Sequence, residues 1–176
     1  MRPRGPDYVR RMEQNVRLDS VDAEILRRLQ NDGRMANKEL AAAVGIAPST
    51  CLDRVARLRR AGAITGYTAQ VDPAAIGRPI EALLAVQVQP HARPLVDPFV
   101  THVLGLPETR AVHHVTGPDD FIVHVACGSS QDLQRLVLDE FTARPEVARL
   151  QTHLIFSTWP GGPLTPYRGA STKDGH

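Results

Sequence analysis

The chain has 176 residues, of which 42% are hydrophobic and only 5% are aromatic. This length allows a buried core in either one ordinary domain or two small ones. No stretch approaches the roughly 20 apolar residues of a membrane-spanning helix, and the first residues lack the apolar run of a signal peptide, so we expect a cytoplasmic protein. Cys51 and Cys127 lie far apart and match neither a disulfide framework nor a zinc motif.

Charge is distributed unevenly along the chain. The formal net charge is +2, but residues 1–80 hold 14 Lys or Arg against 9 Asp or Glu, a net charge of +5. The remaining residues hold 7 against 10, a net charge of −3. A basic half joined to an acidic half fits a nucleic-acid-binding module linked to one that binds something else, although mildly basic domains also arise by chance.

The first segment with a clear period is a helix. Residues 1–17 are polar and Arg-rich without a sustained apolar period, so we expect a flexible arm. Apolar residues then recur at helical spacing and predict a helix over 20–31, with Asp19 or Ser20 as N-cap. The Asn-Asp-Gly sequence at 31–33 supplies a stop.

Two further helices follow at short distance. Asn37 is predicted to cap a short second helix, which Gly45 ends in a left-handed conformation. Pro48 then fits the first turn of a third helix that runs up to Gly62, because a missing N–H is tolerated there. Two helices joined by so short a turn, with arginines on the second, form the helix-turn-helix arrangement of DNA-binding domains.

A strand or short hairpin is predicted after the third helix. Apolar residues over 64–71 have a rough period of two, and Asp72 and Gly77 belong to turn signals that close the segment. We interpret this segment as the wing of a winged helix-turn-helix domain at 18–66, continuing as a strand or linker at 67–80.

The second half alternates strands and helices in the order βαββαβ. The predicted elements are strands at 81–89, 109–116, 119–127 and 147–157, and helices at 93–104 and 130–143. This order indicates an α+β, ferredoxin-like domain at 81–158, with helices on one face of the sheet. We expect the other face, rich in Val, Leu and Ile near 83–88 and 121–125, to be buried in a homodimer. Residues 159–176 are rich in Pro and Gly and are predicted to be disordered.

Between 18 and 157 the chain resembles the leucine-responsive and AsnC-type transcription regulators, also called feast/famine proteins. The matching segments are LDSVD at 18–22, IL at 25–26, DGR at 32–34, ELA at 39–41, VGI at 44–46, RV at 54–55, RL at 57–58 and GYTA at 66–69, with Cys51, Gly62, Ile64, Asp72, Pro73 and Gly77. In the second half, VTGPDDF at 115–121 resembles the family's Gly-x-x-Asp turn between its second and third strands. So many matches in order are highly specific.

The resemblance implies a sequence-specific, DNA-binding transcription regulator with a winged helix-turn-helix domain and a C-terminal RAM-type domain. It also implies that an amino-acid effector changes assembly or DNA binding, and that dimers form, with tetramers or octamers left open. A ligand-independent architectural DNA-binding protein of the same fold is the alternative. The chain departs from the family at Ala47, where a capping Ser is usual, and at Pro118 and Asp119 in the turn.

The candidate DNA contacts lie on the predicted third helix. Arg54 and Arg57 are one turn apart, so both can face the major groove, where Arg recognises guanine edges or phosphate. Ser49, Thr50 and Asp53 share that surface. The alternative is a solvated basic helix face, which Arg59 and Arg60 extend.

The resemblance places the effector in the turn between the second and third strands. Gly117 permits close backbone approach, and Asp120 can accept hydrogen bonds from a ligand ammonium. The other candidate contacts are Thr116, Pro118, Asp119 and Thr152. Because Pro118 removes a donor and Asp119 adds negative charge, a neutral or basic amino acid is favoured over an acidic one. The alternative is that this segment is only a hairpin turn.

Other functions find less support in the sequence. Cys51 lies among apolar helix positions, so we expect packing rather than a redox switch. The histidines at 113, 114, 124 and 153 fall on neighbouring predicted strands, but alternation sends 113 and 114 to opposite faces, so we expect no metal site. No triad is evident, no paired carboxylates in a plausible cleft beyond Asp119 and Asp120, and no phosphate-binding glycine loop. We therefore expect no catalytic residues and no cofactor.

Overall fold

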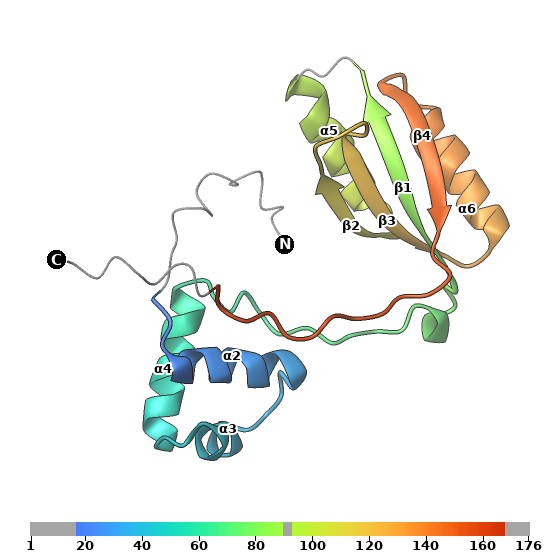
Figure 1. Cartoon of the computed structure of the whole chain (residues 1–176). Helices are drawn as coiled ribbons and strands as arrows, with labels where there is room; N and C mark the ends of the chain where they lie inside the picture. Colours follow the sequence, from blue (N-terminus) through green and yellow to red (C-terminus); the bar gives the residue numbers. More distant parts are fainter. Residues whose placement is uncertain (1–16, 90–92, 168–176) are drawn as a thin grey trace. The chain divides into compact units, whose positions relative to one another are not determined.

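The computed structural model describes residues 17–89 and 93–167 and divides the chain into two compact units (Figure 1). The first unit comprises Met1–Ala69 with Pro160–His176, and the second comprises Gln70–Trp159. Apart from Arg17, the predicted arm lies outside the described residues, as does the end of the predicted tail from 168 onward.

Helix α2 (Ser20–Asn31) opens the first unit and has the bounds predicted from the sequence. Its start is fixed by a capping box: the Asp22 N–H donates to Asp19 Oδ1 at 2.8 Å, and the Asp19 N–H donates to Asp22 Oδ2 at 3.2 Å. Ile25 of α2 is fully buried in the core of this unit.

Helices α3 (Asn37–Val44) and α4 (Pro48–Arg60) complete the helix-turn-helix. Gly45 ends α3 with φ of 72°, the left-handed conformation that glycine adopts without strain. The prediction that Asn37 caps α3 is wrong: Ala36 is the N-cap, and Asn37 Nδ2 donates instead to the Pro48 carbonyl at 2.8 Å. Ala47, the N-cap of α4, makes no side-chain capping bond.

The core of the first unit is small and apolar. Its buried members are Ile25, Leu40, Ala41, Cys51 and Leu58. Burial of the Cys51 side chain between α4 and its neighbours agrees with the packing role expected from the sequence.

No strand forms over 64–71, so the predicted wing is not present as a hairpin in the described chain. A strand needs a partner backbone to bond its N–H and C=O groups, and this segment has none in ladder register among the described residues. Tyr67 and Val71 are correspondingly about half exposed. A single 3₁₀ turn, η1 (Ala74–Ile76), follows and ends at Gly77, as the turn signals predicted.

Residues 160–167, predicted to be disordered, instead lie extended against the first unit. Gln30 of α2 hydrogen-bonds the backbone of Leu164. A hollow of about 390 Å³ is bounded by these residues and by α2 and residues 63–67. Composition indicated disorder because the segment is rich in Pro and Gly, but contacts with another part of the unit order it.

The second unit is the predicted βαββαβ arrangement. Its elements are β1 (Ile80–Val88), α5 (Arg93–Gly105), β2 (Thr109–His114), β3 (Phe121–Cys127), α6 (Ser130–Leu136), the π-helical turn η2 (Val137–Thr142) and β4 (Val147–Leu154). The four strands form one antiparallel sheet in the order β2-β3-β1-β4, with α5 and α6 on one face (Figure 1).

Alternation along the strands divides the sheet into two faces. Leu84, Val86 and Val88 of β1 join the core beneath the helices with Phe99, as do the alternate residues of β3. The sequence predicted that the Val, Leu and Ile residues at 83–88 and 121–125 form the open face of the sheet. This is wrong for most of the Val and Leu residues, because their side chains point to the helices. The opposite face carries, among others, Leu83, Ala85, Gln87, Ile122 and His124.

Candidate DNA-binding and effector sites

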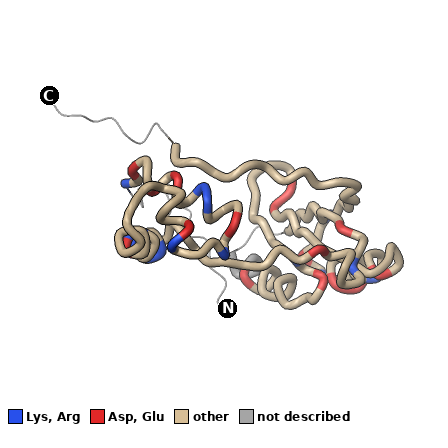
Figure 2. Tube along the Cα trace, turned by 90° about the horizontal axis from the view of Figure 1, so that it is seen from below, with Lys and Arg blue, Asp and Glu red and all other residues tan. Residues whose placement is uncertain are grey.

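Helix α4 has one face buried against the rest of its unit and one face exposed. Cys51 and Leu58 are buried in the core, whereas Ser49, Thr50 and Asp53 are exposed. The helix contains four arginines and a single acidic residue. Figure 2 marks the positions of Lys, Arg, Asp and Glu along the chain. Which of the arginines are available for DNA depends on their partners.

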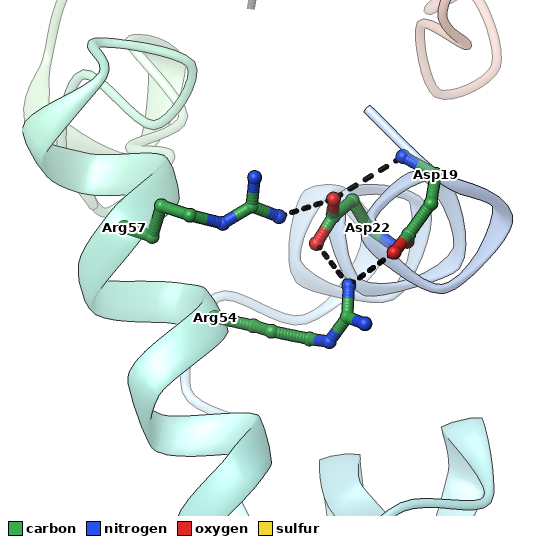
Figure 3. A network of polar contacts seen from close by, with 4 residues as sticks. All are labelled: Asp19, Asp22, Arg54 and Arg57. Atoms are coloured by element: carbon green, nitrogen blue, oxygen red, sulfur yellow. Dashed lines mark hydrogen bonds and ion pairs between the residues drawn. The ribbon is translucent and has the colours of Figure 1, made fainter. Parts of the chain in front are cut away.

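Arg54 and Arg57 point at the N-terminal turn of α2 (Figure 3). Arg54 Nη1 donates to Asp22 Oδ1 at 2.9 Å and to Asp19 Oδ2 at 2.6 Å. Arg57 Nη2 donates to Asp22 Oδ2. The Asp22 side chain is only 1% exposed, so it is a buried carboxylate held by two guanidinium groups and the Asp19 N–H.

The network shifts the ionisation of its outer members. The backbone N–H of Asp22, followed by the guanidinium of Arg54, lowers the pKa of Asp19. Hydrogen bonds to Asp19 and Asp22 raise the pKa of Arg54. The ion pair between Asp19 and Arg54 is therefore present near neutral pH.

The structure thus separates the two arginines from the residues predicted to share their surface. Sequence spacing predicted that both face a DNA groove, but their guanidinium groups contact α2 instead. The Arg54 side chain is 26% exposed and the Arg57 side chain 44%, so Arg57 keeps one accessible edge. Sequence alone missed this because the partners, Asp19 and Asp22, lie more than 30 residues away along the chain.

The exposed face of α4 runs through Ser49, Asp53, Ala56 and Arg60. These positions are spaced four, three and four residues apart, so they lie in one row along the helix. Ser49, Asp53 and Arg60 are exposed, and Thr50 flanks the row. Among the described residues, Arg60 has no hydrogen bond or ion pair. The sequence indicated Arg60 only as part of a basic helix face, although its helical spacing from Asp53 places it in the same row.

The turn between β2 and β3, residues 115–120, is built around Asp120. The Val115 N–H donates to the Asp120 carbonyl at 2.9 Å, and the Asp120 N–H donates to the Val86 carbonyl at 2.9 Å. Asp120 Oδ2 also accepts from the Val88 N–H at 2.8 Å. Gly117 has φ of 132°, a conformation that favours glycine. The Asp120 carboxylate therefore closes the turn onto the end of β1.

Asp119, next in the same turn, has a different environment. Its Oδ1 atom is buried and accepts no hydrogen bond from any described residue. Buried polar atoms in folded proteins are almost always paired, so this acceptor calls for a partner. Thr116, Gly117 and Pro118 lie in the same turn. Thr152 does not join them, because it lies on β4, the strand at the opposite edge of the sheet from β2.

Comparison with protein-family models matches both units. Residues 18–59 match the AsnC-type helix-turn-helix domain, and residues 81–163 match the Lrp/AsnC ligand binding domain. The chain belongs to the Lrp/AsnC family. It is therefore a transcription regulator with a helix-turn-helix DNA-binding domain and a ligand-binding domain, and the α+β fold and family expected from the sequence are confirmed.

Individual members of the Lrp/AsnC family are similar over most of the chain. The HTH-type transcriptional regulator AldR of Mycolicibacterium smegmatis is 41% identical over 154 residues, 88% of each chain. AldR of Mycobacterium tuberculosis is 42% identical over 139 residues, 79% of this chain and 78% of that protein. A transcriptional regulator of Neisseria meningitidis in complex with L-methionine has a TM-score of 0.80 at 26% identity, over 88% of this chain and all of that one.

The four histidines considered as metal ligands, at 113, 114, 124 and 153, lie on three strands of the sheet. His113 lies opposite Ile122, whereas His114 stacks on Phe121 with ring centroids 5.0 Å apart, so the two point to opposite faces as alternation predicted. His124 Nε2 lies 3.0 Å from Glu81 Oε2. Within the part of the chain that the structure describes, no group of three His, Cys, Asp or Glu is arranged to hold a metal ion.

A polar pocket of about 580 Å³ in the ligand-binding unit was not predicted from the sequence. It is lined by Arg78, Cys127, Asp132 and Arg135, among others. Arg78 Nη1 donates to the carbonyls of Pro107 at 2.8 Å and Ala126 at 3.0 Å, so this guanidinium supports the wall of the pocket. None of the predicted effector contacts lines it.

No helix within residues 17–89 and 93–167 is long and apolar enough to cross a membrane.

Proposed function

We propose that this regulator reads DNA through the exposed face of α4. The contacts are Ser49, Thr50, Asp53 and Arg60, together with the accessible edge of Arg57. Arg54 supports the helix rather than touching DNA, because its guanidinium is committed to Asp19 and Asp22. The observation that carries this proposal is the exposed row on α4 opposite its buried face. An α-helix presenting short polar side chains and Arg fits the major groove.

The DNA-binding form is a homodimer in the cytoplasm, and it does not catalyse a reaction. The sheet face opposite the helices carries Leu83, Ala85 and Ile122, and a second copy covers it. Two helix-turn-helix domains then favour pseudo-palindromic sites with half-sites one DNA turn apart, or a multiple of it. Larger assemblies are built from such dimers.

The effector is an amino acid that contacts the turn at 116–120. Asp119 accepts the ligand ammonium through its unpartnered Oδ1, while Asp120 shapes the turn and Gly117 allows close approach. A carboxylate in this position favours a neutral or basic amino acid over an acidic one. Support comes from the neisserial relative, which was crystallised with L-methionine. Thr152, distant within one chain, contributes only if a second copy brings it to the turn.

DNA recognition is tested with duplexes that the full-length protein selects from a random-sequence library. Arg60→Ala is expected to weaken binding to the selected duplex by roughly 1–3 kcal/mol and to relax sequence preference. Arg135→Ala removes the same charge from the second unit and is expected to leave affinity at its wild-type value. If Arg60→Ala binds and discriminates as the wild type does, the exposed face of α4 is not the reading surface.

The ligand is tested by a thermal-shift screen of the purified protein against the common amino acids, since a ligand bound only by the native state raises its apparent stability. A ligand that also changes DNA affinity establishes the regulator as a sensor. Absence of any shift at millimolar concentrations favours a ligand-independent architectural protein.

A further inference from the structure

The Asp22 side chain makes two contacts that its capping role does not require. In a capping box the Asp19 N–H donates one bond to the Asp22 side chain, and this bond is present at 3.2 Å. The same carboxylate also binds Arg54 through Oδ1 and Arg57 through Oδ2. With 1% exposure, Asp22 is the only charged side chain among the buried residues of the described chain.

The network divides the arginines of α4 into two classes. Arg54 and Arg57 are paired with α2, whereas Arg59 and Arg60 make no hydrogen bond or ion pair with the described residues. A guanidinium free to rotate on α4 attracts DNA phosphates of any sequence. A guanidinium held against a buried carboxylate does not reach them, and it also fixes α4 relative to α2 at two points one turn apart.

We infer that Asp22 is a positioning residue that determines specificity: it withholds Arg54, and one edge of Arg57, from the DNA backbone and fixes the angle of α4. This inference rests on the proposed role of α4 as the recognition helix. Without the charge of Asp22, the protein is expected to bind the phosphates of any DNA more strongly and to discriminate less between base sequences. The substitution therefore changes the affinity for the specific duplex and the affinity for nonspecific DNA by different factors.

Asp22→Asn is the decisive substitution, because it keeps the shape of the side chain and an oxygen for the capping bond while removing the charge. Each additional phosphate contact steepens the dependence of log K on log salt concentration by about 0.9. Release of Arg54 and Arg57 is thus expected to make this slope more negative by roughly 1 to 2. The ratio of specific to nonspecific affinity is expected to fall about tenfold, the cost of one misread base pair.

The experiment uses full-length proteins, a duplex selected by the wild type and a scrambled duplex of equal length, titrated at four salt concentrations. Glu39→Gln, which removes one exposed negative charge from α3, controls for the change in net charge and is expected to keep the wild-type slope. The triple variant Asp22→Asn, Arg54→Gln, Arg57→Gln lacks the released guanidinium groups. Its slope is expected to be no steeper than that of the wild type, while its specificity ratio stays below the wild-type value.

Two outcomes overturn the inference. If Asp22→Asn weakens binding to both duplexes by the same factor at an unchanged slope, Asp22 serves folding alone. If the steeper slope persists in the triple variant, the arginines are not its source. Failure of the proposed function is distinguishable, since Arg60→Ala would then leave the specificity of the otherwise wild-type protein intact.

If Asp22→Asn does not fold, a second variant tests whether Arg54 is kept away from the DNA backbone. Arg54→Gln removes one guanidinium and leaves Arg57 on the buried carboxylate. If Arg54 is withheld from DNA, this variant keeps the wild-type salt slope while its specificity ratio falls. A slope shallower by about 0.9 would show that Arg54 contacts a phosphate, and would overturn the inference.

Discussion

The side chain of Gln30 in α2 forms two hydrogen bonds with the backbone of Leu164, which lies 134 residues later in the chain. Its Nε2 donates to the Leu164 carbonyl at 2.9 Å, and the Leu164 N–H donates to its Oε1 at 2.8 Å. The side-chain amide of Gln30 thus bonds both the N–H and the carbonyl of Leu164, as the backbone of a neighbouring strand would. This pairing attaches the segment after β4 to the DNA-binding unit.

Gln30→Ala is expected to release residues 160–167 from α2. Because the bonds are exposed, the cost is about 1 kcal/mol, and the globular core stays folded. Amide hydrogen exchange, read on a peptide that covers 160–167, is expected to accelerate severalfold. Gln134→Ala on α6, an exposed glutamine in the other unit, is the matched control. Unchanged exchange in Gln30→Ala would mean that other contacts hold the segment.

The helices of the first unit could be predicted from the sequence because their ends carry local signals. Asp19 caps α2, Gly45 ends α3 in a left-handed conformation, and Pro48 occupies the first turn of α4. Each signal acts within a few residues, so no knowledge of the fold is needed. Extended segments lack such signals: whether 64–71 pairs as a strand, or 160–167 is ordered, depends on distant partners.

The candidate sites could be predicted only as segments. The sequence correctly brought Gly117, Asp119 and Asp120 into one turn, because they are neighbours in the chain. It did not reveal that Asp120 is engaged by the Val88 N–H while Asp119 has an unpartnered oxygen. Likewise, helical spacing placed Arg54 on the surface of α4 but gave no sign of the buried Asp22. Side-chain pairing across the fold decides these roles.

The two acidic residues of the turn are expected to differ when they are substituted one at a time. Asp119→Asn removes the negative charge that pairs with the ligand ammonium, so amino-acid affinity should fall at least about tenfold with little change in thermal stability. Asp120→Asn weakens the bond to the Val88 N–H and should lower the midpoint of thermal unfolding. Isothermal titration and thermal melts measure the two effects.

Asp97→Asn, an exposed carboxylate on α5, is the control for the loss of one charge in the same unit. Wild-type affinity in Asp119→Asn would exclude Asp119 as the ammonium acceptor. The polar pocket beside Asp132 would then be the alternative ligand site.

Leu83→Glu is expected to dissociate the proposed homodimer. Leu83 lies on the sheet face opposite the helices, between His124 of β3 and His153 of β4 in the strand register. A carboxylate there would be buried in the proposed interface, and burial of a charge is costly. Sedimentation at micromolar concentration should show a dimer for the wild type and a monomer for the variant.

Leu138→Glu places the same charge at a position of η2 that is 52% exposed, and it should leave the dimer intact. A monomeric wild type, or a dimeric Leu83→Glu protein, would contradict burial of this sheet face.

Both thiols are expected to be unreactive in the native protein. The Cys51 and Cys127 side chains are 0% and 1% exposed, and burial raises the pKa of each thiol, with the charge of Glu108 adding to the effect at Cys127. The reactive thiolate is therefore scarce at neutral pH. A chromogenic thiol reagent should react slowly with the native protein and rapidly with both cysteines in denaturant. Fast reaction of either thiol in the native state would point to local opening or to a redox role.

Acid is expected to weaken the first helix through Glu24 and Asp19. Hydrogen bonds from Arg27, at 2.5 and 2.7 Å, and from Arg28 lower the pKa of Glu24 from 4.5 to about 2. A carboxylate whose pKa is depressed on folding contributes stability above its unfolded pKa, and this contribution is lost as the pH falls through the folded value. The lowered pKa of Asp19 acts in the same direction. The midpoint of thermal unfolding should therefore fall as the pH is lowered from about 4.5 to about 2.

Substitution isolates the part that comes from Glu24. Glu24→Gln should reduce the fall in the unfolding midpoint across this range, because the variant has no such proton to bind. Glu39→Gln, at an exposed position of α3 with no ion pair among the described residues, should keep the wild-type profile. Because the Glu24 pairs are open to solvent, raising the salt concentration to about 1 M, where the Debye length is about 3 Å, should narrow the difference between Glu24→Gln and wild type. Identical acid profiles for Glu24→Gln and wild type at low salt would show that the ion pairs of α2 do not contribute to stability.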